Sequence, residues 1–151
     1  MNIGELCNRE VIVANRDDSV LAAAKLMREY HVGDVVVVEQ RGQGRVPVGI
    51  LTDRDIVVEL IATEVDTKTV TVSDAMSTEL LTVREDDDIS DMIEQMRGKA
   101  VRRVPVVDVN DALVGIVTVD DVIDVMAEQF DALVSLVQRE KHREQIVRSR
   151  A

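Results

Sequence analysis

Short apolar runs and amphipathic segments alternate along this chain, in an order that occurs twice. The runs at residues 35–38 and 104–107 are rich in valine, as buried strands are. Apolar residues at helical spacing precede each run. These are Val20, Ala23, Ala24 and Met27 in one copy and Ile89, Met92, Ile93 and Met96 in the other. The pattern therefore predicts an amphipathic helix followed by a buried strand in each half of the chain.

Shorter apolar segments complete the order of elements. One short strand is predicted before each helix, and one further strand should form a hairpin with each buried run. A second helix is expected after each hairpin, which gives the order β-α-β-β-α twice. The short strands are expected at residues 11–14 and 80–83, and the last strands at residues 48–51 and 113–117.

The two halves are diverged copies of one unit. An offset of 69 residues aligns residues 35–38 with 104–107, and an offset of 66 holds after residue 48. The change in offset predicts a loop at residues 39–47 that is three residues longer than its counterpart. A unit of about 55 residues buries too little surface alone, so the copies should pack on each other. We expect an α/β (α+β) fold of two tandem repeats about a pseudo-twofold axis.

The expected domain boundaries follow from the repeats and end in a helical extension. The first repeat is expected at residues 1–62, a linker at 63–71, the second repeat at 72–130 and a C-terminal helical tail at 131–151. Neither Gly nor Pro occurs from Ile116 onward, so the last helix need not stop with the repeat. Its apolar residues Met126, Phe130, Leu133 and Val137 form a heptad-like seam. That seam should bury against a partner chain or fold back on its own module.

Composition and charge exclude several classes of function. The net charge of −11 argues against a nucleic-acid surface, which needs clustered Lys and Arg. The single Cys7 gives no disulfide framework, and the N-terminal residues lack a secretion signal. No apolar run approaches the ~18 residues of a membrane span. His31 and His142 do not repeat, so no metal site is expected. We therefore expect a soluble, cytoplasmic protein.

One polar motif occurs twice, each time at the junction between a predicted strand and the following predicted helix. Thr52 with Asp55 and Thr118 with Asp121 form two Thr-x-x-Asp segments at matching positions. A hydroxyl at a helix N-terminus suits an anion, and a carboxylate one turn later can accept hydrogen bonds from a ribose. The same residues also suit a helix N-cap that is worth ~1 kcal/mol and needs no ligand. Both roles can hold at once.

The repeated motif belongs to a wider set of resemblances. Together with Val-Ser-Asp-Ala-Met-Ser at residues 72–77 and Arg-Arg-Val-Pro-Val-Val-Asp at 102–108, it resembles a tandem pair of cystathionine-β-synthase (CBS) domains, a Bateman module. The resemblance covers residue 3 to about residue 130. It implies a regulatory module, not an enzyme, that senses an adenosyl small molecule (AMP, ADP, ATP, NAD or S-adenosylmethionine). AMP or ATP is the expected ligand, a homodimer is the expected assembly, and the effector protein is unknown.

The resemblance also implies two composite clefts. In each cleft, ribose and phosphate ligands from one repeat meet the backbone edge that reads adenine in the other. We expect Arg102 and Arg103 to favour phosphate-rich ligands in the cleft of Asp121, because Gly33 and Asp34 stand at the equivalent positions. The expected ligand set is Thr118 and Asp121 with Val32 and Gly33, Thr52 and Asp55 with Val101 and Arg102, and Arg54, Arg102 and Arg103 for phosphate.

Two other functions stay open at this point. The chain could be a structural assembly module whose Thr and Asp side chains only cap helices. It could also be a small hydrolase that uses paired carboxylates, although no constellation of His, Cys and carboxylates repeats. A ligand-dependent rise in stability separates the first alternative from sensing, and formation of a product reveals the second.

Overall fold

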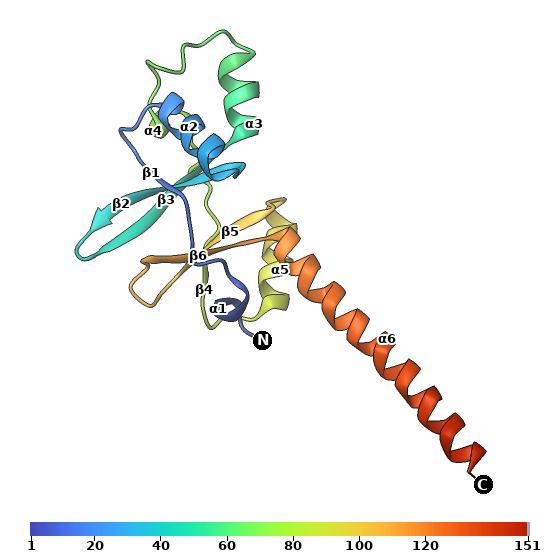
Figure 1. Cartoon of the computed structure of the whole chain (residues 1–151). Helices are drawn as coiled ribbons and strands as arrows, with labels where there is room; N and C mark the ends of the chain where they lie inside the picture. The colour runs from blue at the N-terminus through green and yellow to red at the C-terminus, as the bar shows by residue number, and fades with distance from the viewer. Residues whose placement is uncertain (151) are drawn as a thin grey trace. The chain divides into compact units, whose positions relative to one another are not determined.

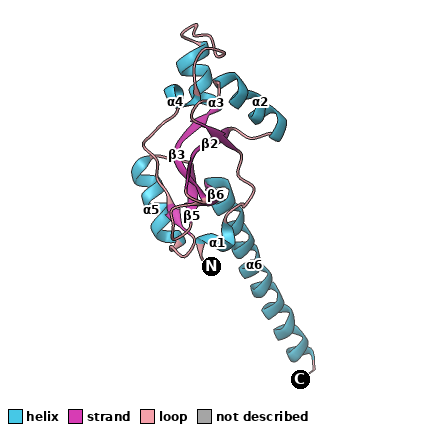
Figure 2. Ribbon diagram, turned by 90° about the vertical axis from the view of Figure 1, so that its left-hand side faces the viewer, coloured by secondary structure: helices cyan, strands magenta, loops and turns pink. Residues whose placement is uncertain are grey.

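The computed structural model describes residues 1–150, which form two compact units (Figure 1). One unit is Met1–Val117 and the other begins at Thr118. The first unit contains both β-sheets, whose strands are magenta in Figure 2. The second unit is a single long helix with its N-cap.

The elements follow the predicted order β-α-β-β-α twice, and each repeat is preceded by a short lead-in helix that was not predicted. The first repeat comprises α1 (Ile3–Leu6), β1 (Val13–Asn15), α2 (Val20–Tyr30), β2 (Asp34–Arg41), β3 (Gly44–Thr52), α3 (Asp53–Asp55) and the π-helix η1 (Ile56–Ile61). The second repeat comprises α4 (Val72–Ala75), β4 (Val83–Arg84), α5 (Ile89–Lys99), β5 (Arg103–Val107), β6 (Leu113–Thr118) and α6 (Val119–Ser149).

Each repeat forms its own three-stranded sheet, in the orders β1-β2-β3 and β4-β5-β6. The first strand is parallel to the second in both sheets, and β2 is antiparallel to β3. Successive side chains of a strand point to opposite faces. Residues 35–38 are all buried, so both faces of β2 are covered there. Val35 and Val37 lie in the core of the first repeat, whereas Val36 and Val38 pack with Ile116 of the second repeat. This double burial explains why residues 35–38 are all apolar.

The repeats exchange their lead-in segments. Asn8 and Ile116 donate backbone hydrogen bonds to each other, both at 2.9 Å. Ser77 and Ile50 do the same at 2.9 and 3.1 Å. Asn8 matches Ser77 and Ile50 matches Ile116 in the sequence repeat, so the two pairs are equivalent. The reciprocal exchange confirms the predicted pseudo-twofold relation between the repeats.

Two equivalent glycines permit the lead-ins to approach the hairpins. A Cβ at Gly49 would lie 2.9 Å from the carbonyl oxygen of Ser77, and one at Gly115 would lie 3.0 Å from that of Asn8 and 2.6 Å from Cys7 Sγ. Real Cβ atoms essentially never make contacts under 3.0 Å, such as those with the Ser77 oxygen and the Cys7 sulfur, and the contact with the Asn8 oxygen is also tighter than most. The glycine of each Gly-Ile-x-Thr-x-x-Asp segment is therefore required by packing, and Cys7 is a packing group.

The first hairpin differs from the sequence prediction. Residues 39–47 were expected to form a long loop, but the ladder continues through the pairs Gln40 with Arg45 and Arg41 with Gly44. The turn is tight, and Gly42 supplies its positive φ of 60°. A register shift follows Val37, and Val38 pairs with Pro47. The predicted long loop is wrong, because the extra residues lengthen the strands of the hairpin.

The last helices of the two repeats also differ from each other. In the first repeat, three α-helical residues lead into the π-helix η1, where only Ile56 and Leu60 are buried. Four of the six η1 residues are β-branched, and such residues crowd the preceding turn of an α-helix. In the second repeat α6 continues for 31 residues, as the lack of Gly and Pro predicted. Within residues 1–150, none of the helices has the length and apolarity to cross a membrane.

Candidate ligand-binding site

Both Thr-x-x-Asp segments form complete capping boxes. Thr52 Oγ1 accepts a hydrogen bond from the Asp55 amide at 3.1 Å, and the Thr52 amide donates to Asp55 Oδ2 at 3.0 Å. In the second copy the corresponding distances are 3.2 Å and 2.8 Å, and Thr118 Oγ1 also donates to Asp121 Oδ2 at 2.9 Å. The capping role is therefore confirmed in both copies.

Each cap holds the aspartate carboxylate in place through only one of its two oxygens. The capping bonds to Asp55 and Asp121 use Oδ2 of each carboxylate. Oδ1 takes no part in either cap. A carboxylate that already accepts from the amide of the capping threonine loses little freedom when it binds a ligand hydroxyl. The ribose-binding role of these residues stays a prediction.

Arg103 of the second repeat forms an ion pair with Asp34 of the first. Asp34 begins β2 and pairs with Thr52 in the ladder to β3, so Arg103 lies beside the strand end that carries Thr52. The Arg103 side chain is 29% exposed and the Asp34 side chain is 15% exposed. The ion pair thus brings the start of β5, which follows the predicted ligands Val101 and Arg102, to the Thr52 end of the first sheet.

The ion pair changes the electrostatics that were predicted for this region. Burial raises the pKa of the Asp34 carboxyl, while the charge and hydrogen bond of Arg103 oppose that rise and the neighbouring Asp53 adds to it. Arg103 is predicted to contact phosphate, and the ion pair with Asp34 offsets part of its charge. The sequence held a signal for this pair, since opposite charges occupy equivalent positions of the two repeats.

The predicted base-reading residues use their amides within their own repeats. The Val32 amide donates to the carbonyl of Met27 at 3.1 Å, and the Val101 amide donates to that of Met96 at 3.0 Å. Each follows a helix that ends in a left-handed residue, at His31 and Ala100. The amides of Val32 and Val101 are therefore already used by their own helices, and the base-reading role of these residues stays a prediction.

An acidic side chain that was not in the predicted set lies against Gly33. The Asp53 amide donates to the Gly33 carbonyl at 2.9 Å, and Asp53 Oδ2 lies 3.2 Å from where a Cβ of Gly33 would stand. The Arg54 amide donates a hydrogen bond to Asp53 Oδ1 at 2.8 Å, and Arg54 is exposed. Thr118 and Asp121 belong to the second unit, so their predicted cleft with Val32 and Gly33 stays a prediction.

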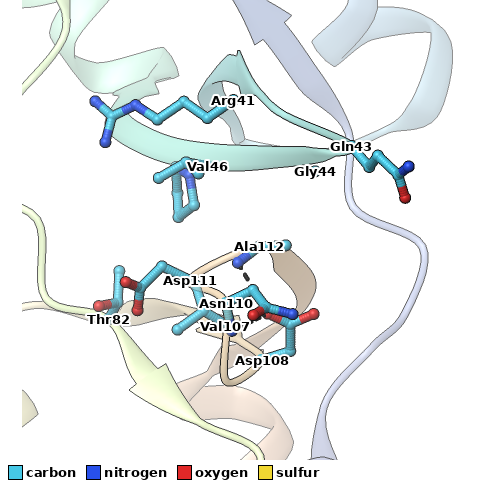
Figure 3. A pocket seen from close by; sticks show the side chains of 11 residues that line it. Arg41, Gln43, Gly44, Val46, Thr82, Val107, Asp108, Asn110, Asp111 and Ala112 are labelled. Carbon is cyan, nitrogen blue, oxygen red and sulfur yellow. Dashed lines mark hydrogen bonds between the residues drawn. The ribbon is translucent and has the colours of Figure 1, made fainter.

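A cavity of ≈ 750 Å³ lies at the turns of the two hairpins, and none of the predicted ligand residues lines it (Figure 3). Gly44, which lines the cavity, begins β3, whereas Thr52 ends that strand. The cavity is therefore at the opposite end of β3 from the capping box. Asp108 shapes its second turn by accepting from the Asn110 and Ala112 amides at 2.8 and 3.0 Å. The lining residues are Arg41, Gln43, Gly44, Val46, Pro47, Thr82, Val107, Asp108, Asn110, Asp111 and Ala112.

Comparison with known families decides the assignment of the two repeats. The model of the CBS domain matches residues 3–62 and again residues 72–128. The chain belongs to the CBS domain family. Its two CBS repeats are thus the two sheets with their helices. Residues 1–150 hold no group of three or more His, Cys, Asp or Glu side chains that could bind a metal ion.

Individual relatives include proteins with bound ligands. The uncharacterized protein MK0525 of Methanopyrus kandleri is 34% identical over 83% of this chain, which spans 62% of that protein. The crystal structure of Hypoxic Response Protein I with two coordinated zinc ions has a TM-score of 0.72 and 31% identity, and the match covers 82% of this chain and 98% of that one. The CBS domain pair of protein MJ0100, in complex with 5′-methylthioadenosine and S-adenosyl-L-methionine, has a TM-score of 0.74 and 25% identity, with 85% and 98% covered.

Proposed function

We propose that this CBS pair is a regulatory module that senses an adenosyl small molecule and performs no chemistry itself. The observation that carries the proposal is the repetition of one fixed Thr-x-x-Asp geometry at equivalent strand-to-helix junctions. Asp55 and Asp121 would each bind the ribose hydroxyls through Oδ1, while Thr52 and Thr118 would lie near the first phosphate or its replacement. The similarity to a CBS pair that binds two adenosyl compounds supports this ligand class.

The base would be read by backbone carbonyls next to Val32 and Val101. Since the Val32 and Val101 amides donate to helix ends, these positions would accept from an adenine amino group through their carbonyls. Guanine carries a carbonyl where adenine carries that amino group, so it would place one acceptor against another. The proposed module should therefore discriminate against guanosine compounds.

The charges near the first-repeat strand ends favour ligands with few phosphates. Asp34 offsets the charge of Arg103, and Asp53 adds a further carboxylate beside Gly33. Arg54 and Arg102 are the remaining proposed cationic contacts. A nucleoside thioether or sulfonium, or AMP, avoids the repulsion that the extra phosphates of ATP would meet at these carboxylates. We thus propose adenosyl compounds as the class and place ATP below AMP in expected affinity.

Thermal denaturation with a panel of ligands tests the proposal. The panel is 5′-methylthioadenosine, S-adenosylmethionine, AMP, ADP, ATP and NAD, with GMP as the control for base reading. A ligand at 100 times its Kd should stabilise the fold by ~2.7 kcal/mol. A shift with no adenosyl compound would favour the structural assembly alternative. Turnover of any compound in the panel would favour the hydrolase.

The proposal extends to the oligomeric state, the compartment and the effector of the module. We propose a homodimer in the cytoplasm that passes ligand occupancy to an effector protein. The lone cysteine supports a reducing compartment, and the exposed apolar side chains of α6 support self-association. Sedimentation with and without 5′-methylthioadenosine tests both the dimer and its response to ligand.

A further inference from the structure

The second unit presents an apolar seam that is exposed along α6. Met126, Phe130, Leu133 and Val137 are each at least half exposed, and Phe130, the chain's single phenylalanine, is 70% exposed. Their spacings of four, three and four residues place them on one face of the helix. Large apolar side chains in a continuous exposed row indicate an interaction surface.

The charges along α6 are divided between its two halves. Residues 119–131 carry five acidic side chains and no Lys or Arg. Residues 138–150 carry five Lys or Arg and two Glu, so their net charge is 5 − 2 = +3. The N-terminal half of α6 is therefore acidic and the C-terminal half is basic. The seam residues Met126 and Phe130 lie in the acidic half. The five acidic residues of the first half are Asp120, Asp121, Asp124, Glu128 and Asp131.

This division of charge selects the orientation of a second copy on the seam. In a parallel pair, five carboxylates of one helix would run beside the same five carboxylates of the other. In an antiparallel pair centred between Phe130 and Leu133, the acidic half would instead lie along residues 132–144 of the second copy, which carry three Lys or Arg against two Glu. The helix macrodipoles also attract each other in the antiparallel arrangement.

We infer that α6 is an antiparallel dimerisation helix, in which the seam of one copy packs on the seam of a second copy of this chain. The register that buries most of the seam places Met126 opposite Val137 and Phe130 opposite Leu133, in both directions across the twofold axis. The inference rests on the proposed homodimer and adds its surface, its orientation and its register. It does not depend on the proposed adenosyl ligand.

Cysteine crosslinking tests the orientation directly. On a Cys7→Ser background, chains that carry Met126→Cys should crosslink to chains that carry Val137→Cys, and neither variant should crosslink to itself. In the antiparallel pair, residue 126 of one copy lies about 17 Å along the axis from residue 126 of the other, since α-helices rise 1.5 Å per residue. Disulfides need Cα atoms within about 7 Å. Crosslinking of Met126→Cys to itself would overturn the antiparallel orientation.

Sedimentation of full-length variants tests whether the seam is the surface. Phe130→Glu should raise the dimer dissociation constant at least about tenfold, because it places a charge at the centre of the seam. Ala132→Glu is the matched control on the opposite face of α6, and it should change the constant less than about threefold. Added salt should weaken the dimer, because it screens the attraction between the acidic half of one α6 and the basic residues of the other. A monomeric wild-type chain, equal effects of the two variants, or a dimer strengthened by salt would overturn the inference.

Discussion

Asp34 and Arg103 stand at the same position of the two CBS repeats, 69 residues apart, and form an ion pair with each other. A pseudo-twofold axis brings equivalent positions together, so a residue near the axis meets its own counterpart. Two aspartates or two arginines here would repel each other inside the module. The repeats therefore need different residues at this position, and the contact explains why one strand begins with an acid and the other with a base.

Removing Arg103 should cost more stability than removing Asp34. Arg103→Gln leaves the Asp34 carboxylate, which is 15% exposed, without its cation, and should lower the free energy of unfolding by about 1–3 kcal/mol at neutral pH. Asp34→Asn should cost less, because burial already disfavours the charge on Asp34. Urea denaturation measures both values. Arg97→Gln in the exposed pair with Glu94 is the control, expected within about 0.5 kcal/mol of wild type. A cost for Arg103→Gln no larger than that of the control would contradict the interpretation.

The raised pKa of Asp34 predicts how stability depends on pH. The folded chain keeps the Asp34 proton to a higher pH than the unfolded chain, whose carboxyl has the ordinary pKa of 3.8. The stabilising contribution of Asp34 is therefore complete below that value and is lost as the pH rises through the folded pKa. The difference in unfolding free energy between wild type and Asp34→Asn should decline over this window. A difference that grows with pH would show that the attraction of Arg103 outweighs burial.

Local pattern was sufficient to predict most of this fold. Helices α2 and α5, the valine strands, both capping boxes and the length of α6 follow from periodicity and from residue types within one segment. The tight turn at Gly42 was missed because the change in offset locates the extra residues but does not say whether they lengthen the loop or the strands. The π-helix η1 was missed because six residues are too few to distinguish its period from that of an α-helix.

Contacts between distant segments were beyond the reach of local pattern. The lead-in exchange joins Asn8 to Ile116, and no periodicity reports such a pairing. The repeat offset itself carried a usable signal, because equivalent residues of opposite charge can be paired across a pseudo-twofold axis. The acidic side chain of Asp53 beside Gly33 was missed for a similar reason: its neighbour is set by the ladder between β2 and β3.

The glycines that admit the lead-ins should not tolerate a methyl group. Gly49→Ala and Gly115→Ala should each lower the free energy of unfolding by about 1–3 kcal/mol, because the new Cβ would collide with the Ser77 carbonyl or the Cys7 sulfur of the lead-in. Gly98→Ala is the matched control inside α5, where a Cβ has nothing within 4 Å. It should stabilise the chain by about 0.5–1 kcal/mol through helix propensity. Thermal or urea denaturation of the three variants checks the sign of each change, and a neutral Gly49→Ala would remove the packing explanation.

The two capping carboxylates should contribute to ligand affinity as well as to stability. Asp55→Ala and Asp121→Ala should each lower the free energy of unfolding by about 1 kcal/mol through loss of the cap. Each should also cost about 1–3 kcal/mol of affinity for 5′-methylthioadenosine in the cleft that it serves, the range for a lost hydrogen bond to a charged group. Calorimetry separates the two clefts, because each variant should lose one binding event and keep the other.

A third Thr-x-x-Asp segment provides the control that separates the two roles. Thr71 caps the start of α4 and its Oγ1 donates to Asp74 Oδ2 at 2.9 Å, yet Asp74 lies outside the proposed ligand set. Asp74→Ala should therefore remove a bond to a capping threonine, lower the free energy of unfolding and leave the affinity unchanged. If all three variants bind 5′-methylthioadenosine as the wild type does, Asp55 and Asp121 are caps only. An equal loss of affinity in all three would mean that binding responds to stability, because Asp74 contacts no proposed ligand group.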